Sequence, residues 1–311
     1  GVPALRARER VRRRRCDLLG TAIQRIGLRM RTKIWGCRGS LASPGPETIR
    51  YGGNTSCMEV RLGDGTLIVL DAGTGIRPFG LSLDPERDKT IHLFLSHLHL
   101  DHLEGLGFFS PLWRPEVELH VWGPPSPLRS LEQRIARYLS PPLFPVHLSD
   151  IPSHPQFHDV PDGDFTIGPA TVRAQPISHR GPTVGFRISE NGRTMAYLPD
   201  HEPALGVDLA EMEPEWISGH SIAEGADVLF HDAQYTPEEY ADRVGWGHSS
   251  VEHVVTFGLV SKVKQLVMFH HDPLHSDGHL ESLVTRAGEL WGANGNGGGP
   301  ILAYEGMEVE F

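Results

Sequence analysis

The sequence has few cysteines and no long hydrophobic run. Its three cysteines are Cys16, Cys37 and Cys57. None has the Cys-x-x-Cys spacing of a thiolate metal site, and three cannot form a disulfide framework, so we expect a reducing compartment and a cytoplasmic location. No run approaches the roughly eighteen apolar residues that span a bilayer, so no membrane partner is expected. The 39% of hydrophobic residues nevertheless suffices for a sizeable globular core.

The acidic charge of the chain is unevenly distributed. The net charge is −10, yet residues 1–33 carry 11 Lys and Arg against 2 Asp and Glu. The remainder is strongly acidic, which disfavours long nucleic acid as a partner, because phosphate neutralisation dominates that affinity. We expect residues 1–32 to be a disordered basic extension, with a nucleic-acid or membrane arm as the alternative. The extension lacks the apolar segment of a signal peptide.

In the rest of the chain, strand-like runs alternate with turn segments that contain Gly and Pro. No internal repeat is present, and the glycine-rich stretch 292–299 is expected to be a loop. Many strands with interspersed helices predict packed sheets with helices outside them. Candidate strands cover 33–37, 57–62, 67–70, 91–96, 117–122, 165–175, 184–189, 194–198, 228–230, 265–269 and 301–311, and candidate helices cover 127–139, 250–260 and 279–291.

Three imidazoles and a carboxylate follow directly after the apolar run 91–95, in the order His97-x-His99-x-Asp101-His102. In an extended chain, residues two apart point to the same side, so His97 and His99 are placed to face one ion. Asp101 and His102 follow where the chain turns, and are placed to face a second ion. Neutral imidazole and carboxylate are ligands that Zn²⁺, Mn²⁺ and Fe²⁺ accept. The segment therefore predicts a metal site at the end of a strand.

This motif resembles the hallmark of the metallo-β-lactamase superfamily. The resemblance implies an α/β (α+β) fold, the αββα sandwich, in which two mixed β-sheets face each other and helices lie outside. It assigns residues 33–311 to one hydrolase domain. It also implies two divalent metal ions, with Zn²⁺ expected first and Mn²⁺ or Fe²⁺ as alternatives.

The same resemblance supplies the remaining ligands, each at the end of a later strand-like run. His179 resembles the third ligand of the first metal, beside His97 and His99. Asp200 resembles the aspartate that bridges both metals. His270 completes the second metal site with Asp101 and His102, although the neighbouring His271 competes for that place, since strand alternation lets only one of the two face the site.

Two further segments resemble the phosphodiesterase branch of the superfamily, which includes tRNase Z and cyclic-nucleotide phosphodiesterases. Downstream, His248 precedes Ser249-Ser250 as in tRNase Z-like enzymes, so His248 is expected to contact the scissile phosphate or protonate the leaving oxygen, with Asp232 orienting it. Asp101 is the alternative proton carrier. The other segment is a glycine-rich loop whose donors suit phosphate oxygens, namely Arg38, Arg50, Asn54, Thr55 and Ser56.

These features predict a di-metal phosphodiesterase in which a metal-bridging hydroxide attacks phosphorus. The acidic body and the absence of a long basic arm between residues 122 and 164 favour a small phosphodiester such as a cyclic nucleotide. A residue that stacks on a base is expected among six aromatic candidates, although aromatic residues more often lie in the core: Tyr51, Phe79, Trp113, Trp122, Tyr235 and Trp246. The alternatives are a tRNase Z-like RNA-processing nuclease, a carboxylic ester, thioester or lactone hydrolase, and a metal-binding regulator without activity. A homodimer is expected because dimers are common in this branch.

Overall fold

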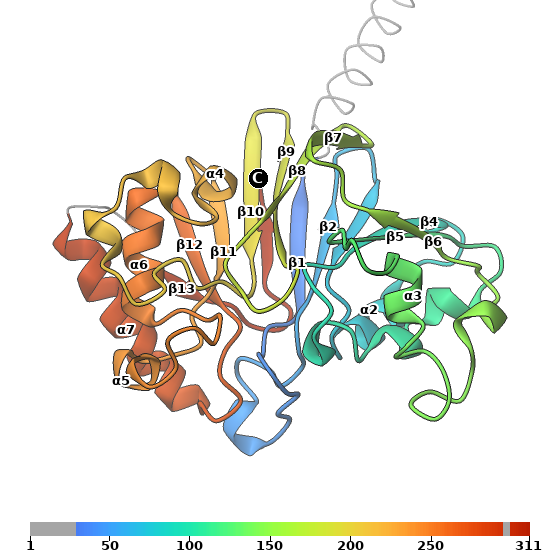
Figure 1. Ribbon diagram of the computed structural model, residues 1–311, viewed down its shortest axis with the longest axis horizontal. Coiled ribbons are helices and arrows are strands. Elements are labelled where there is room, and N and C mark those ends of the chain that lie inside the picture. Colours follow the sequence, from blue (N-terminus) through green and yellow to red (C-terminus); the bar gives the residue numbers. More distant parts are fainter. Residues whose placement is uncertain (1–28, 295–298) are drawn as a thin grey trace, which may run out of the picture.

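The computed structural model describes residues 29–294 and 299–311, which form two seven-stranded sheets packed face to face with helices outside them (Figure 1). Helices α2 and α3 lie over the first sheet, and α4, α6 and α7 lie over the second. This arrangement confirms the predicted αββα sandwich. The predicted basic extension falls mainly on residues 1–28, which lie outside the described residues.

The first sheet is mixed and has the strand order β14-β1-β2-β3-β4-β5-β6. Strands β3, β4, β5 and β6 run parallel, and the others pair antiparallel. Strand β3 is buried at every position because the second sheet covers one of its faces and helices cover the other. The bounds are β1 Arg31–Gly36, β2 Cys57–Arg61, β3 Leu67–Leu70, β4 Thr90–Phe94, β5 Glu118–Gly123, β6 Gln156–Asp159 and β14 Glu308–Glu310.

The second sheet has the strand order β13-β12-β11-β10-β9-β8-β7. Strands β10 to β13 are parallel, so the carboxyl ends of β10, β11 and β12 lie at one edge of the sheet. The bounds are β7 Gly163–Ile167, β8 Ala170–Pro176, β9 Val184–Glu190, β10 Arg193–Leu198, β11 Val228–Asp232, β12 Gln265–Phe269 and β13 Ile301–Leu302.

The helices are short except for the last two. Helix α6 begins after Ser250, whose side chain accepts a hydrogen bond from His253 N, as the Ser-Ser pair in the sequence predicts. No helix among the described residues is long and apolar enough to cross a bilayer. The bounds are α2 Ile76–Ser82, α3 Leu131–Ile135, α4 His220–Ala223, α5 Pro237–Ala241, α6 Val251–Val260 and α7 Asp277–Ala293.

Three predicted elements differ from the structure. The run 165–175 is not one strand, because Gly168, with a φ of 52°, and Pro169 turn the chain between β7 and β8. The run 301–311 is likewise divided, and its two strands belong to different sheets. The helix expected over 127–139 shrinks to α3, which Ser130 caps. Gly-Pro at 168–169 was a usable turn signal in the sequence.

Candidate metal centre

Seven side chains converge just beyond the carboxyl ends of β4, β8, β10 and β12. They form two groups in which the potential ligand atoms lie within 4.8 Å of one another. Asp200 belongs to both groups, which is the arrangement that the sequence analysis assigned to it. The first group is His97, His99, His179 and Asp200, and the second is Asp101, His102, Asp200 and His270.

The carboxylate of Asp200 lies between the two groups of histidines. Its Oδ2 is 3.6 Å from Nε2 of His97 and 3.6 Å from Nε2 of His179. Its Oδ1 is 2.8 Å from Nε2 of His102 and 3.2 Å from Nε2 of His270. One carboxylate oxygen therefore faces each histidine set, as a bridging ligand between two cations requires.

The donor set fits two divalent cations. His97 Nε2 and Asp200 Oδ1 are buried without a hydrogen bond of suitable geometry, although buried polar atoms are almost always satisfied. Burial lowers the pKa of His97, His99 and His179, which favours the neutral imidazole that binds a metal. The second group adds the carboxylate of Asp101 to that of Asp200, and their negative charge offsets that of a cation.

The structure places His270, and not His271, in the cluster. His270 has a φ of 58°, a left-handed conformation that turns the chain at the end of β12. Its Nδ1 is 3.0 Å from Oε1 of Gln234, which leaves Nε2 directed at Asp101 and Asp200. The His271 Nε2 instead donates to the carbonyl of Ala303 at 2.9 Å.

Asp71, which the sequence analysis missed, lies behind the second group at the end of β3. This fully buried carboxylate accepts hydrogen bonds from His102 Nδ1 at 2.8 Å, from Tyr197 Oη at 2.9 Å and from the Ser96 amide at 2.7 Å. A carboxylate on the far nitrogen of a ligating imidazole fixes its tautomer and orientation. An Asp-Ala-Gly sequence directly after an apolar strand was the available signal.

His248 and Asp232 form a hydrogen-bonded pair beside the cluster. His248 Nδ1 is 2.7 Å from Asp232 Oδ2 and 3.9 Å from Asp200 Oδ2. Burial by itself lowers the pKa of His248, but the charge of Asp232 and its hydrogen bond outweigh this and raise that pKa to about 9. Asp232 is itself held by the backbone amides of His201 and Gln234. Asp232 therefore favours the protonated form of the imidazole and fixes its orientation.

Arg38 differs most from its expected role. Its side chain is 0% exposed, and its guanidinium donates to the carbonyls of Gly52, Asp272 and His275 at 2.7–3.0 Å. The guanidinium thus ties the glycine-rich loop to the segment after β12 and has no surface to offer a phosphate. Five donors in one planar fork suit this internal role as well as they suit an anion.

The other expected phosphate donors also have internal partners or are buried. Arg50 is paired with Glu281 at the surface. Asn54 Nδ2 donates to Glu305 at 3.0 Å, and Thr55 Oγ1 donates to Glu104 at 3.2 Å. Ser56 is completely buried. The structure therefore does not present this loop as a set of free donors at the cluster.

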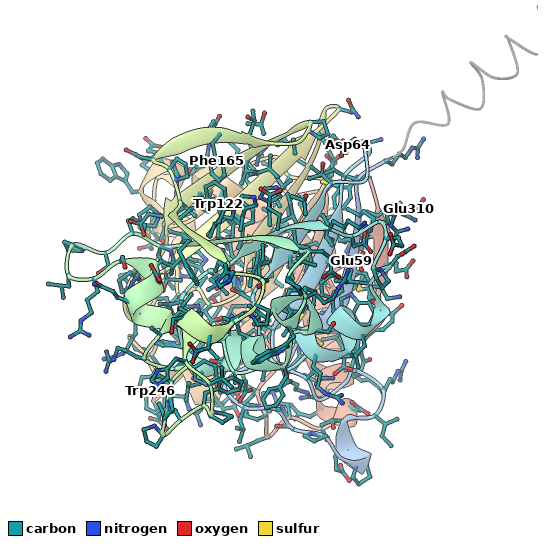
Figure 2. All side chains as sticks on the ribbon, turned by 90° about the vertical axis from the view of Figure 1, so that its right-hand side faces the viewer. Glu59, Asp64, Trp122, Phe165, Trp246 and Glu310 are labelled. Carbon is teal, nitrogen blue, oxygen red and sulfur yellow. The ribbon has the colours of Figure 1, made fainter. Side chains whose placement is uncertain are left out.

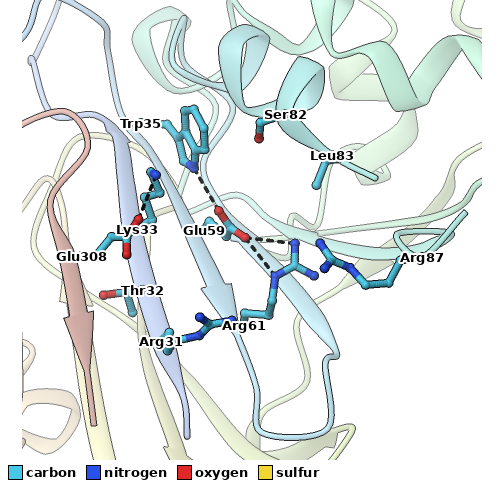
Figure 3. Close-up of a pocket in the computed structure, with 10 residues that line it drawn as sticks. All are labelled: Arg31, Thr32, Lys33, Trp35, Glu59, Arg61, Ser82, Leu83, Arg87 and Glu308. Carbon is cyan, nitrogen blue, oxygen red and sulfur yellow. Dashed lines mark hydrogen bonds and ion pairs between the residues drawn. The ribbon is translucent and has the colours of Figure 1, made fainter. Parts of the chain in front are cut away.

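A separate cavity of about 290 Å³ lies on the outer face of β1 and β2 (Figure 3). There Arg31, Lys33 and Trp35 alternate with the buried residues Thr32 and Ile34. Two of its four basic side chains lie in ion pairs with its acidic ones, namely Lys33 with Glu308 and Arg61 with Glu59. None of the predicted metal ligands lines it, so this cavity is not part of the metal centre.

Comparison with known proteins agrees with this geometry. Residues 66–271 match the family model of the beta-lactamase superfamily domain. A ribonuclease Z from Mycobacterium sp. (strain KMS) is 27% identical over 262 residues, which cover 79% of this chain and 86% of the relative.

Solved structures show the same fold. The metallo-beta-lactamase fold protein YhfI from Bacillus subtilis superposes with a TM-score of 0.65 at 18% identity, covering 91% of this chain and 99% of its own. A diphosphatase of the PhnP family superposes with a TM-score of 0.62 at 21% identity, covering 91% of this chain and 98% of its own.

Proposed function

The chain belongs to the beta-lactamase superfamily, and from that premise we propose that it is a di-metal hydrolase that cleaves phosphodiester bonds. The observation that carries the proposal is the His248–Asp232 pair beside the bridging carboxylate. When a phosphodiester is cleaved, the leaving group departs as an alkoxide, which needs a proton. A protonated imidazole held next to the metal ligands is suited to supply that proton.

His97, His99 and His179 would hold one metal ion, Asp101, His102 and His270 the other, and Asp200 would bridge them. Bound there, two divalent ions supply Lewis acidity and a water of lowered pKa. Zn²⁺ is the proposed ion, with Mn²⁺ or Fe²⁺ as alternatives, because imidazole suits all three.

The protein's own side chains supply orientation and the proton. Asp232 accepts from His248 Nδ1, which leaves Nε2 as the atom that donates to the leaving oxygen. Asp101 Oδ2 already accepts a hydrogen bond from the Ser40 amide at 2.8 Å and lies 3.2 Å from His270 Nε2. We therefore assign metal binding to Asp101, and we assign the transfer of the proton to the leaving group to His248.

The preferred substrate is a small phosphodiester such as a cyclic nucleotide, and a homodimer in the cytoplasm is the proposed working form. The acidic body supports a small substrate, because it would repel a long polyanion. In the 124–155 segment, Leu131, Ile135 and Leu139 pack into the core beside the first sheet, which ties this part of the segment to the body of the protein.

A second candidate is RNA processing of the ribonuclease Z type. The similarity to the mycobacterial ribonuclease Z favours it, because the match extends over most of that relative's length. Both candidates need the same bond cleavage and the same ligands, and they differ only in what surrounds the scissile phosphate.

The decisive experiment compares substrates on the metal-loaded protein. We expect hydrolysis of bis-p-nitrophenyl phosphate and none of p-nitrophenyl acetate or a lactone, with Asp200→Ala inactive on all of them. Faster cleavage of the acetate or lactone than of the diester would overturn the proposal, as would full activity of Asp200→Ala. A precursor tRNA cleaved with a higher kcat/KM than cyclic AMP would select the second candidate.

A further inference from the structure

The loop that carries His248 also carries an exposed tryptophan, and both are held rigidly. The buried carboxylate of Glu202 accepts hydrogen bonds from the amides of Gly245 and Gly247, each at 2.7 Å. From the other side, His179 Nδ1 donates to the Gly247 carbonyl at 2.8 Å. Trp246 is thus fixed between two residues whose backbone is tied to the metal cluster and its support.

The glycines on either side of Trp246 are needed by this geometry. Gly245 and Gly247 have φ angles of 82° and 96°, which side-chain-bearing residues rarely adopt. A Cβ on Gly247 would also overlap the ring of His179. The backbone at Gly247 therefore lies against the imidazole of His179, and Trp246 is the residue between the two glycines.

The indole of Trp246 is 56% exposed, although tryptophan is usually among the most buried side chains. Figure 2 shows it at the lower rim of the molecule, away from the sheets. Within residues 29–294 and 299–311, no aromatic ring stacks against it. An exposed apolar ring on a loop whose backbone contacts the imidazole of His179 offers a flat face to a ligand.

Positive charge accompanies the indole. Arg180 follows the ligand His179, and its Nε donates to the Gly245 carbonyl at 2.8 Å. In the part of the chain that the structure describes, its Nη atoms have no acceptor. A guanidinium that can bind phosphate oxygens is thus hydrogen-bonded to the loop that carries a ring able to stack on a base.

We propose that Trp246 is a specificity-determining residue that stacks on the base of a nucleotide-derived phosphodiester whose phosphate lies at the metal centre. The proposal rests on the proposed phosphodiesterase function and names its substrate class. Any base can stack on an aromatic side chain, so the site would favour substrates that carry a nucleobase without distinguishing which base it is.

The test uses two esters with the same leaving group, thymidine 5′-(p-nitrophenyl phosphate) and methyl p-nitrophenyl phosphate. The measured quantity is the ratio of their kcat/KM values on the metal-loaded protein. We expect this ratio to fall about tenfold or more in Trp246→Ala, mainly through the KM of the thymidine ester, and to be largely restored in Trp246→Phe. Trp216→Ala is the matched control, since Trp216 is also an exposed tryptophan in a connecting segment, and its ratio should equal that of the wild type.

The outcomes separate this inference from the function on which it rests. An unchanged ratio in Trp246→Ala would overturn the stacking role, including the case in which both esters lose activity equally because the loop has shifted. A wild-type protein that cleaves neither ester would overturn the proposed function, and the inference with it.

Discussion

His102 Nδ1 donates a hydrogen bond of 2.8 Å to Oδ2 of Asp71, and both side chains are completely buried. The bond leaves His102 Nε2 as the free nitrogen, directed at Asp200 Oδ1 2.8 Å away. The tautomer of a proposed metal ligand is thereby set by a residue outside the two ligand groups. Two parallel strands bring the pair together, because Asp71 ends β3 and the histidine motif follows β4.

Replacement of Asp71 should therefore weaken metal binding without removing a ligand. We expect Asp71→Asn to lower the affinity for Zn²⁺ by roughly 10- to 100-fold, because the amide holds the His102 ring less firmly and polarises it less. Competition with a chromophoric chelator would measure this affinity. Asp64→Asn is the control, since Asp64 is an exposed aspartate before β3 whose side chain accepts a hydrogen bond from the Thr66 amide. Equal Zn²⁺ affinities for the two variants would show that Asp71 does not support metal binding.

Loss of His248 should matter most when the leaving group is poor. We expect His248→Ala to lower kcat about 10²- to 10⁴-fold for an alkyl phosphodiester, because the departing alkoxide then lacks its proton donor. The loss should be much smaller for a p-nitrophenyl ester, whose leaving group departs without a proton. Asp232→Asn should show the same dependence in weaker form. A loss of equal size for both kinds of ester would argue against proton donation by His248.

Arg38 and Arg50 should behave as opposites in stability measurements. Arg38→Met leaves the carbonyls of Gly52, Asp272 and His275 without their donor, at about 1–3 kcal/mol for each buried group. We therefore expect a loss of at least about 3 kcal/mol in the free energy of unfolding, measured with urea. Arg50→Ala breaks a surface ion pair with Glu281 and an exposed contact with the Tyr51 ring, and should cost about 1 kcal/mol. If the Arg38→Met protein were as stable as the wild type and had a raised KM for phosphodiesters, the result would instead support phosphate binding by Arg38.

His92 should make the fold sensitive to acid, independently of the metal centre. Burial, with the nearby imidazoles of His120 and His158, lowers the pKa of His92 to about 4. The unfolded chain, with a histidine pKa of about 6.5, takes up a proton in this range that the folded protein does not. The stability contributed by this group is complete above pH 6.5 and is lost as the pH falls toward 4.

His92→Phe should remove this contribution to the pH dependence. In urea titrations with a chelator present, its free energy of unfolding should fall less between pH 7 and pH 4.5 than that of the wild type. His147→Phe, which changes an exposed histidine, should retain the wild-type dependence. Parallel curves for His92→Phe and the wild type would contradict the assignment.

The sequence by itself determined the class of fold and the identity of the ligand types. The first four ligands, from His97 to His102, lie within six positions, so their spacing alone specifies a shared site at a strand end. His179, Asp200 and His270 each follow an apolar run. The strands that precede them, β8, β10 and β12, run in the same direction, so their carboxyl ends lie at one edge of the second sheet. Local pattern and family resemblance together were enough to group these seven residues.

Only the tertiary structure decided what each polar side chain faces. The left-handed backbone at His270 turns that ring into the cluster and leaves His271 bound to Ala303, and no periodicity encodes such a turn. The guanidinium of Arg38 looks like a phosphate donor in the sequence, yet its partners are carbonyls more than two hundred residues away and on its own loop. The reason is physical: hydrogen-bonding capacity is a property of the residue, but which acceptor satisfies a buried donor depends on contacts that exist only after the two sheets have packed.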